Sequence, residues 1–143
     1  MIYAKCIRES QITYTHEQFV ARQSEEYHVY CEGEVTESKN GLNLLCCVPL
    51  NLIYDCLKYG EYIAIIEYNS DETEYKSSSV VAATYSMVRQ KVLKIMFADD
   101  IKTVKYVLDE VGDINTVTFG YIYYLSNDVK KYIKDEMKTH YKY

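Results

Sequence analysis

The chain has 143 residues, a length typical of one domain that buries its core without disulfides or metal ions. Hydrophobic residues make up 48% and charged residues 26% of it, which excludes general disorder, and no apolar run reaches the ~18 residues of a transmembrane helix. The formal net charge is −5, and because phosphate binding usually requires a basic patch, nucleic acid is not the partner that we favour.

The N-terminal third predicts strands and one short helix. Alternation of apolar and polar residues over Ile2–Arg8 predicts a first strand. Thr15 followed by Gln18 has the spacing of a capping box, which predicts a short helix through about Arg22. Further strands are expected over residues 27–32 and 42–47, with an Asn-Gly turn at 39–41.

A helix is predicted to begin at Pro49, the only proline, because proline fits the first helical turn. Apolar side chains follow it at the spacing i, i+3, i+4 and i+7, which places them on one helical face. Gly60 is expected to end this helix as a left-handed cap. We predict that the apolar face is buried and consists of Leu50, Ile53, Tyr54 and Leu57.

The second half predicts further strands, two helices and a polar loop. Asp99 or Asp100 is expected to cap a helix that Gly112 ends, and Ser126 to cap a last helix. Strands are expected over residues 62–68, 80–85 and 91–97, a structureless polar stretch over 69–79, and a strand or tight strand pair over 116–125. The prediction is one α+β domain over residues 1–143, with a mostly antiparallel sheet and about three helices.

The five cysteines predict reduced thiols. Their number is odd, and no signal peptide precedes them, so we expect a reducing, cytoplasmic compartment. No C-x2-C pair is present, so no metal site is expected, and no motif indicates a cofactor. The adjacent Cys46 and Cys47 lie in an apolar run, which favours core thiols over a nucleophile.

Residues 33–68 resemble a known family. Their order is Gly33-Glu34-Val35, then Asn40-Gly41-Leu42 leading to Cys46 and Pro49, then a helix and a strand that ends in Glu67. This resembles a phage-associated domain of unknown function with an N-G-F-H-F-C-x-x-P signature. The resemblance implies a phage or mobile element as the source and the cytoplasm of a bacterial host as the setting.

Two alternatives depend on the acidic stretch 61–79. The order of strand, Asn-Gly turn, strand and helix also resembles part of an ADP-ribosyltransferase, in which Glu72 and Glu74 would form the Glu-x-Glu element. This resemblance implies an enzyme that uses NAD, or a relative that binds a nucleotide. The same acidic residues could instead mimic nucleic-acid phosphates against a basic groove.

The surface that we expect to bind a partner lies in the C-terminal third. The chain has 17 tyrosines, and Tyr121, Tyr123 and Tyr124 occupy the segment expected to be a strand, where alternation leaves one aromatic row available. The last helix is expected to present Lys130 and Lys134 beside them. Exposed aromatics next to cations are typical of a protein-binding hot spot.

The functional expectation is a small inhibitor that acts without catalysis. The basis is the small size, the acidity, the excess of tyrosine and the absence of any catalytic motif. A host protein is the expected partner, such as a CRISPR effector or another defence component. The residues expected to contact it are Tyr121, Tyr123, Tyr124, Lys130, Lys134, Glu72 and Glu74.

Overall fold

The computed structural model describes residues 2–39, 45–67, 73–78 and 83–140, and for 73–78, 83 and 140 it describes the backbone alone. The strands are β1 (Tyr3–Ile7), β2 (Val35–Glu37), β3 (Leu45–Pro49), β4 (Tyr62–Ile66), β5 (Thr73–Ser78), β6 (Ala83–Met87) and β7 (Arg89–Phe97). The α-helices are α1 (His16–Ala21), α2 (Ile101–Val111) and α3 (Asn127–His140). Short 3-10 turns are η1 (Glu9–Gln11), η2 (Arg22–Ser24), η3 (Leu50–Asp55), η4 (Leu57–Tyr59), η6 (Ile114–Thr116) and η7 (Ile122–Tyr124).

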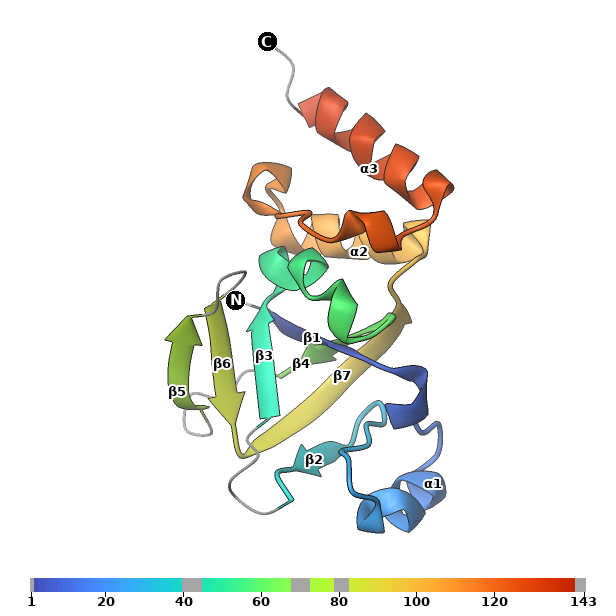
Figure 1. The fold of residues 1–143 in the computed structure, drawn as a ribbon, viewed down its shortest axis with the longest axis vertical. Helices are drawn as coiled ribbons and strands as arrows, with labels where there is room; N and C mark the ends of the chain where they lie inside the picture. Colours follow the sequence, from blue (N-terminus) through green and yellow to red (C-terminus); the bar gives the residue numbers. More distant parts are fainter. Residues whose placement is uncertain (1, 40–44, 68–72, 79–82, 141–143) are drawn as a thin grey trace.

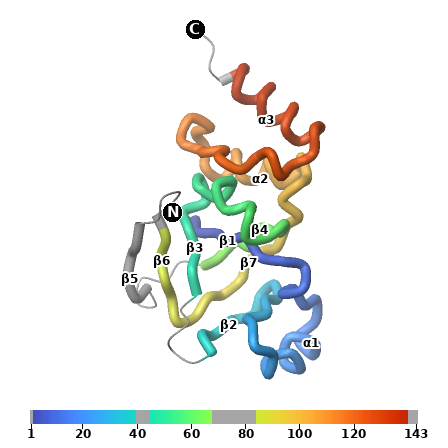
Figure 2. Tube along the Cα trace, viewed as in Figure 1, coloured from blue at the N-terminus to red at the C-terminus, as the bar shows by residue number. Residues whose placement is uncertain are grey.

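The strands form one sheet in the order β2-β7-β4-β1-β3-β6-β5, and neighbouring strands pair antiparallel (Figure 1). The C-terminal elements α2 and α3 lie together at one end of the molecule, and α1 lies at the opposite end (Figure 2). This architecture confirms the predicted fold class, a small α+β domain with a mostly antiparallel sheet and three α-helices in the described part of the chain.

The core has two main parts, one on each face of the sheet. Successive side chains of a strand point to opposite faces, so β1 contributes Ala4 and Cys6 to one face and Tyr3 and Ile7 to the other. The first face packs against η3, η4, α2 and α3. The second face is covered by the chain that follows β1, through side chains such as Tyr30. Both faces are therefore buried near β1, the middle strand.

Most of the predicted strands are confirmed, with corrections at three places, of which the segment 116–125 is described below. The predicted strand at 27–32 is wrong, because Tyr30 forms only an isolated bridge with Ile12. Val29 and Cys31 pack in one cluster and Tyr30 packs in another, so the side chains alternate as in a strand, although the segment pairs through this one bridge and not as a ladder. The polar stretch 69–79 is not structureless, since it contains β5 at the sheet edge. Several predicted parts lie outside the described residues: the Asn-Gly turn at 40–41, the strand starts at 42–44 and 80–82, and the strand end at 68.

The segment after Pro49 is buried as predicted but is not one α-helix. It forms the 3-10 turns η3 and η4, and Leu50, Ile53, Tyr54 and Leu57 are all at most 6% exposed. Gly60 is not a left-handed cap, since its φ is 170°, an extended conformation. A Cβ at this position would lie 2.2 Å from the Ile7 carbonyl carbon. Gly60 is thus suited to a close approach between two backbone segments.

The predicted helix ends are mostly confirmed. Thr15 accepts a hydrogen bond from the Gln18 N–H at the start of α1, and Asp100 accepts one from Lys102 N–H at the start of α2. Gly112 ends α2 with φ 85°, in the left-handed region that favours glycine. α3 buries Val129 and Ile133, and Tyr132 and Met137 on the same side pack against the core while partly exposed.

The predicted strand over 116–125 is wrong. This segment contains η6 and η7, and its backbone bonds run to η3 instead of to a neighbouring strand. The Thr118 N–H donates to the Asn51 carbonyl at 3.0 Å, and the Tyr121 N–H donates to the Tyr54 carbonyl at 3.2 Å. The loop therefore docks on η3, and the alternation expected for its tyrosines does not apply.

Candidate protein-binding surface

Three tyrosines at η7 form an exposed aromatic group, called here the tyrosine cluster: Tyr121, Tyr123 and Tyr124. The ring centroids of Tyr123 and Tyr124 are 4.7 Å apart and stacked, and Tyr121 lies 5.7 Å and 6.2 Å from them. Tyr123 is 62% exposed and Tyr124 is 56% exposed, whereas Tyr121 is half-buried. Because the rings restrict one another, the cluster presents a large apolar surface with little side-chain freedom to lose on binding.

A lysine from η4 extends this surface. The Lys58 ammonium lies 5.3 Å from the centroid of the Tyr121 ring and 5.1 Å from that of Tyr59. These distances are typical of cation–π contacts. The neighbouring Tyr121 and Tyr59 raise the pKa of Lys58, so the ammonium stays charged at neutral pH. Tyr59 is itself 60% exposed and adds a fourth ring beside the cluster.

A buried carboxylate holds the loop that carries the cluster. Asp55, at the end of η3, is 5% exposed. One of its oxygens accepts the Gly120 N–H at 2.7 Å, and the other accepts the Thr118 hydroxyl at 2.5 Å. A Cβ on Gly120 would lie 2.6 Å from the Asp55 oxygen, so only glycine fits here without a shift. Asp55 thus fixes the backbone immediately before Tyr121.

A hollow of about 260 Å³ lies beside the cluster. Its wall includes Tyr124 and side chains of both charges, Arg8 and Lys58 against Glu61 and Asp99. Asp99 accepts the Ser126 N–H at 2.8 Å, which ties the end of the loop to the start of α2. The surface thus combines exposed rings with a recess lined by side chains of both charges.

The structure brings together only part of the residues predicted to bind a partner. Tyr121, Tyr123 and Tyr124 are adjacent, as predicted, although they lie on a 3-10 turn. Lys130 and Lys134 lie on α3, and the cation that contacts the rings is Lys58 instead. Glu72 lies outside the described residues, and Glu74 belongs to β5 at the far edge of the sheet, where only the backbone is described.

Sequence reasoning missed Asp55, Lys58 and Tyr59. They lie outside the apolar face of the helix predicted to begin at Pro49, so their positions indicated only solvent-facing residues. The available signal was weak, namely a Lys-Tyr pair directly before Gly60. The roles of Asp55 and Lys58 depend on contacts with residues more than 60 positions away in the chain.

Two histidines have described side chains, and neither belongs to the tyrosine cluster. His16 Nδ1 lies 2.7 Å from a Glu34 oxygen at the surface. His28 is half-buried, and burial, with Lys5 and Lys39, lowers its pKa. Within the described residues, no group of three or more histidines, cysteines or carboxylates could hold a metal ion.

Comparisons with known proteins identify no relative. No family model, no curated protein and no solved structure matches the chain significantly. None of the helices in the described ranges has both the length and the apolar character that a bilayer crossing requires.

Proposed function

We propose that the chain is a non-catalytic binding protein that inhibits a bacterial host protein through the tyrosine cluster. The observation that carries this proposal is a set of stacked, exposed rings held on a loop that a buried carboxylate anchors. Rigid aromatic side chains that bury in a partner dominate many protein interfaces. Lys58 and the charged recess beside Tyr124 supply the polar surroundings of such a hot spot.

The proposed source is a phage or mobile element, on the resemblance of residues 33–68. This source makes a defence component, such as a CRISPR effector, the partner class to test first. The ADP-ribosyltransferase alternative depends on Glu72, which lies outside the described residues, and on Glu74, whose backbone belongs to the edge strand β5.

The test compares single alanine variants of the cluster in binding to a partner. The tagged protein captures partners from a bacterial lysate, and each purified partner is then titrated by calorimetry. We expect Tyr123→Ala and Tyr124→Ala to lose roughly 2 kcal/mol or more of binding free energy while their unfolding curves stay unchanged. The matched control is Tyr14→Ala, which removes a ring that is 72% exposed at the N-terminal side of the molecule.

Two outcomes would contradict the proposal. Equal losses in Tyr14→Ala and Tyr123→Ala would mean that the cluster has no special role. Transfer of label from NAD to a target, lost in Glu74→Gln, would instead establish the enzyme that the Glu-x-Glu resemblance implies.

A further inference from the structure

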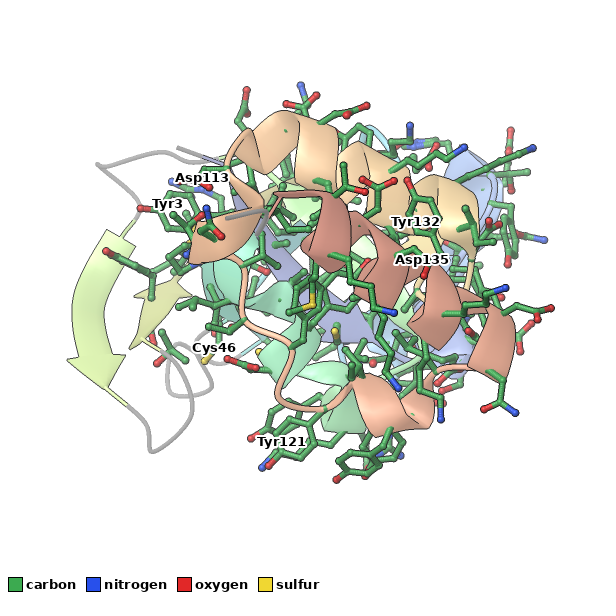
Figure 3. All side chains as sticks on the ribbon, turned by 90° about the horizontal axis from the view of Figure 1, so that it is seen from above. Tyr3, Cys46, Asp113, Tyr121, Tyr132 and Asp135 are labelled. Carbon is green, nitrogen blue, oxygen red and sulfur yellow. The ribbon has the colours of Figure 1, made fainter. Side chains whose placement is uncertain are left out.

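A second hollow lies on the sheet face that η3 and η4 only partly cover. Its volume is about 360 Å³, within the range of small-molecule sites. Ala4 and Cys6 of β1 and Cys46 and Val48 of β3 line it from the sheet, because alternate residues of a strand share one face. In the view from above, Cys46 lies beside the helices α2 and α3 and is not covered by them (Figure 3).

The opposite wall of the cavity comes from the end of η3 and from η4. Cys56 and Tyr59 line this side. The Cys6 and Cys56 thiols lie 3.8 Å and 3.9 Å from the carbonyls of Ile53 and Leu52, to which they donate weakly. Three thiols from separate elements thus meet one apolar space, and Tyr59 stands at its exposed rim.

Burial keeps the Cys6 and Cys56 thiols of this wall neutral. Burial raises the pKa of Cys56 to about 11, and it raises the pKa of Cys6 further. Neutral thiols are weak nucleophiles but are polarizable, and they pack like small hydrophobic groups. The wall therefore favours apolar contact over covalent chemistry.

The two charged groups at the wall are already paired. The Asp55 carboxylate is occupied by Thr118 and Gly120. The Lys5 ammonium donates to the Tyr30 hydroxyl at 2.7 Å and to Gln90 Oε1 at 3.1 Å. A charged ligand would have to break one of these arrangements or remain unpaired, which costs free energy in a partly dry site.

From these observations we infer that this cavity, lined by Ala4, Cys6, Cys46, Val48, Cys56 and Tyr59, binds a small uncharged aromatic molecule. The size of the cavity, its polarizable sulfur groups and the existing hydrogen bonds of Lys5 and Asp55 all favour such a ligand. Sulfur groups make favourable contacts with aromatic rings, and Tyr59 offers a ring at the entrance. This site borders the proposed partner surface and shares Tyr59 with it, but ligand binding to the cavity can be tested without the partner.

The test is a titration of the whole protein with indole, followed by amide NMR. We expect saturable shifts at residues 4–6, 46–48 and 55–59. Indole-3-acetate, which adds a carboxylate to the same ring system, should bind about tenfold more weakly or less. Indole should also slow the alkylation of Cys46, the exposed thiol of the five.

A cavity-filling variant provides the matched comparison. Cys46→Phe occupies the space from an exposed position, so it should fold and weaken indole binding by about tenfold or more. Val35→Phe adds a ring at the exposed surface of β2 and should bind indole like the wild type. Unsaturable shifts, shifts centred elsewhere, equal binding of indole-3-acetate, or unchanged binding by Cys46→Phe would each overturn the inference.

Discussion

The buried carboxylate of Asp55 is the residue on which the proposed surface most depends. Hydrogen bonds to a charged group are worth about 1.5–3 kcal/mol each, and Asp55 accepts two of them. We expect Asp55→Ala to lower the free energy of unfolding by about 2–4 kcal/mol in urea denaturation. Asp113→Ala is the control, because Asp113 also accepts a backbone N–H, that of Asn115, but is exposed. Asp113→Ala should lower the free energy of unfolding by about 1 kcal/mol. Equal decreases in Asp55→Ala and Asp113→Ala would contradict the assigned role of Asp55.

His28 makes the stability depend on pH. Burial and the charges of Lys5 and Lys39 lower its pKa, and its buried Nε2 has no hydrogen-bond partner among the described residues. The unfolded chain therefore binds a proton more readily than the folded one. The free energy of unfolding is therefore highest above the ordinary histidine pKa of about 6.5. It decreases as the pH falls from there toward the lower pKa of His28 in the folded chain.

The measurement is urea denaturation of the wild type and His28→Gln between about pH 7.5 and pH 5.5. The wild type should lose stability more steeply on acidification than His28→Gln does. His16→Gln serves as the control for the general effect of removing an imidazole, since His16 lies at the surface beside Glu34. Identical slopes for wild type and His28→Gln would show that His28 is not desolvated.

Among the elements, η3 and η4 are the most consequential, since they join the sheet core to the surface. Ile53 is fully buried and Leu57 is 6% exposed. We expect Ile53→Ala or Leu57→Ala to lower the free energy of unfolding by about 2–5 kcal/mol, because each leaves a cavity in the core.

The control on the same element is Lys58→Ala, which changes an exposed side chain. Its free energy of unfolding should stay within about 0.5 kcal/mol of the wild type. Partner binding should nevertheless weaken, because the cation beside Tyr121 is lost. Melting temperatures unmoved by both core truncations would show that η3 and η4 are not part of the core.

At the scale of the whole molecule, the reactivity of the five free cysteines shows which parts of the native fold are accessible to solvent. Cys46 is exposed and Cys56 is half-buried, while the other three are buried. We expect five thiols to titrate in denaturant and one, Cys46, to react fast in the native protein. Elemental analysis should find no zinc, and one stoichiometric zinc per chain would contradict this prediction.

Local periodicity in the sequence determined which side chains are buried. The apolar spacing after Pro49 identified four core residues even though the backbone there is 3-10, because both geometries keep i and i+3 close to one side. The caps at Thr15, Asp100 and Gly112 were likewise predictable, since each depends on bonds or dihedral angles within a few residues.

Only the tertiary structure determined the conformation of segments whose contacts are with residues distant in the chain. The segment 116–125 is a docked loop because its backbone finds Asn51, Tyr54 and Asp55, and Gly60 is needed because the Ile7 backbone passes beside it. The sequence identified the tyrosines of the proposed surface, but the cation and the carboxylate that complete it come from elsewhere. Contacts across more than 50 residues leave no local pattern, so hydrogen bonding and packing in the folded chain determine them.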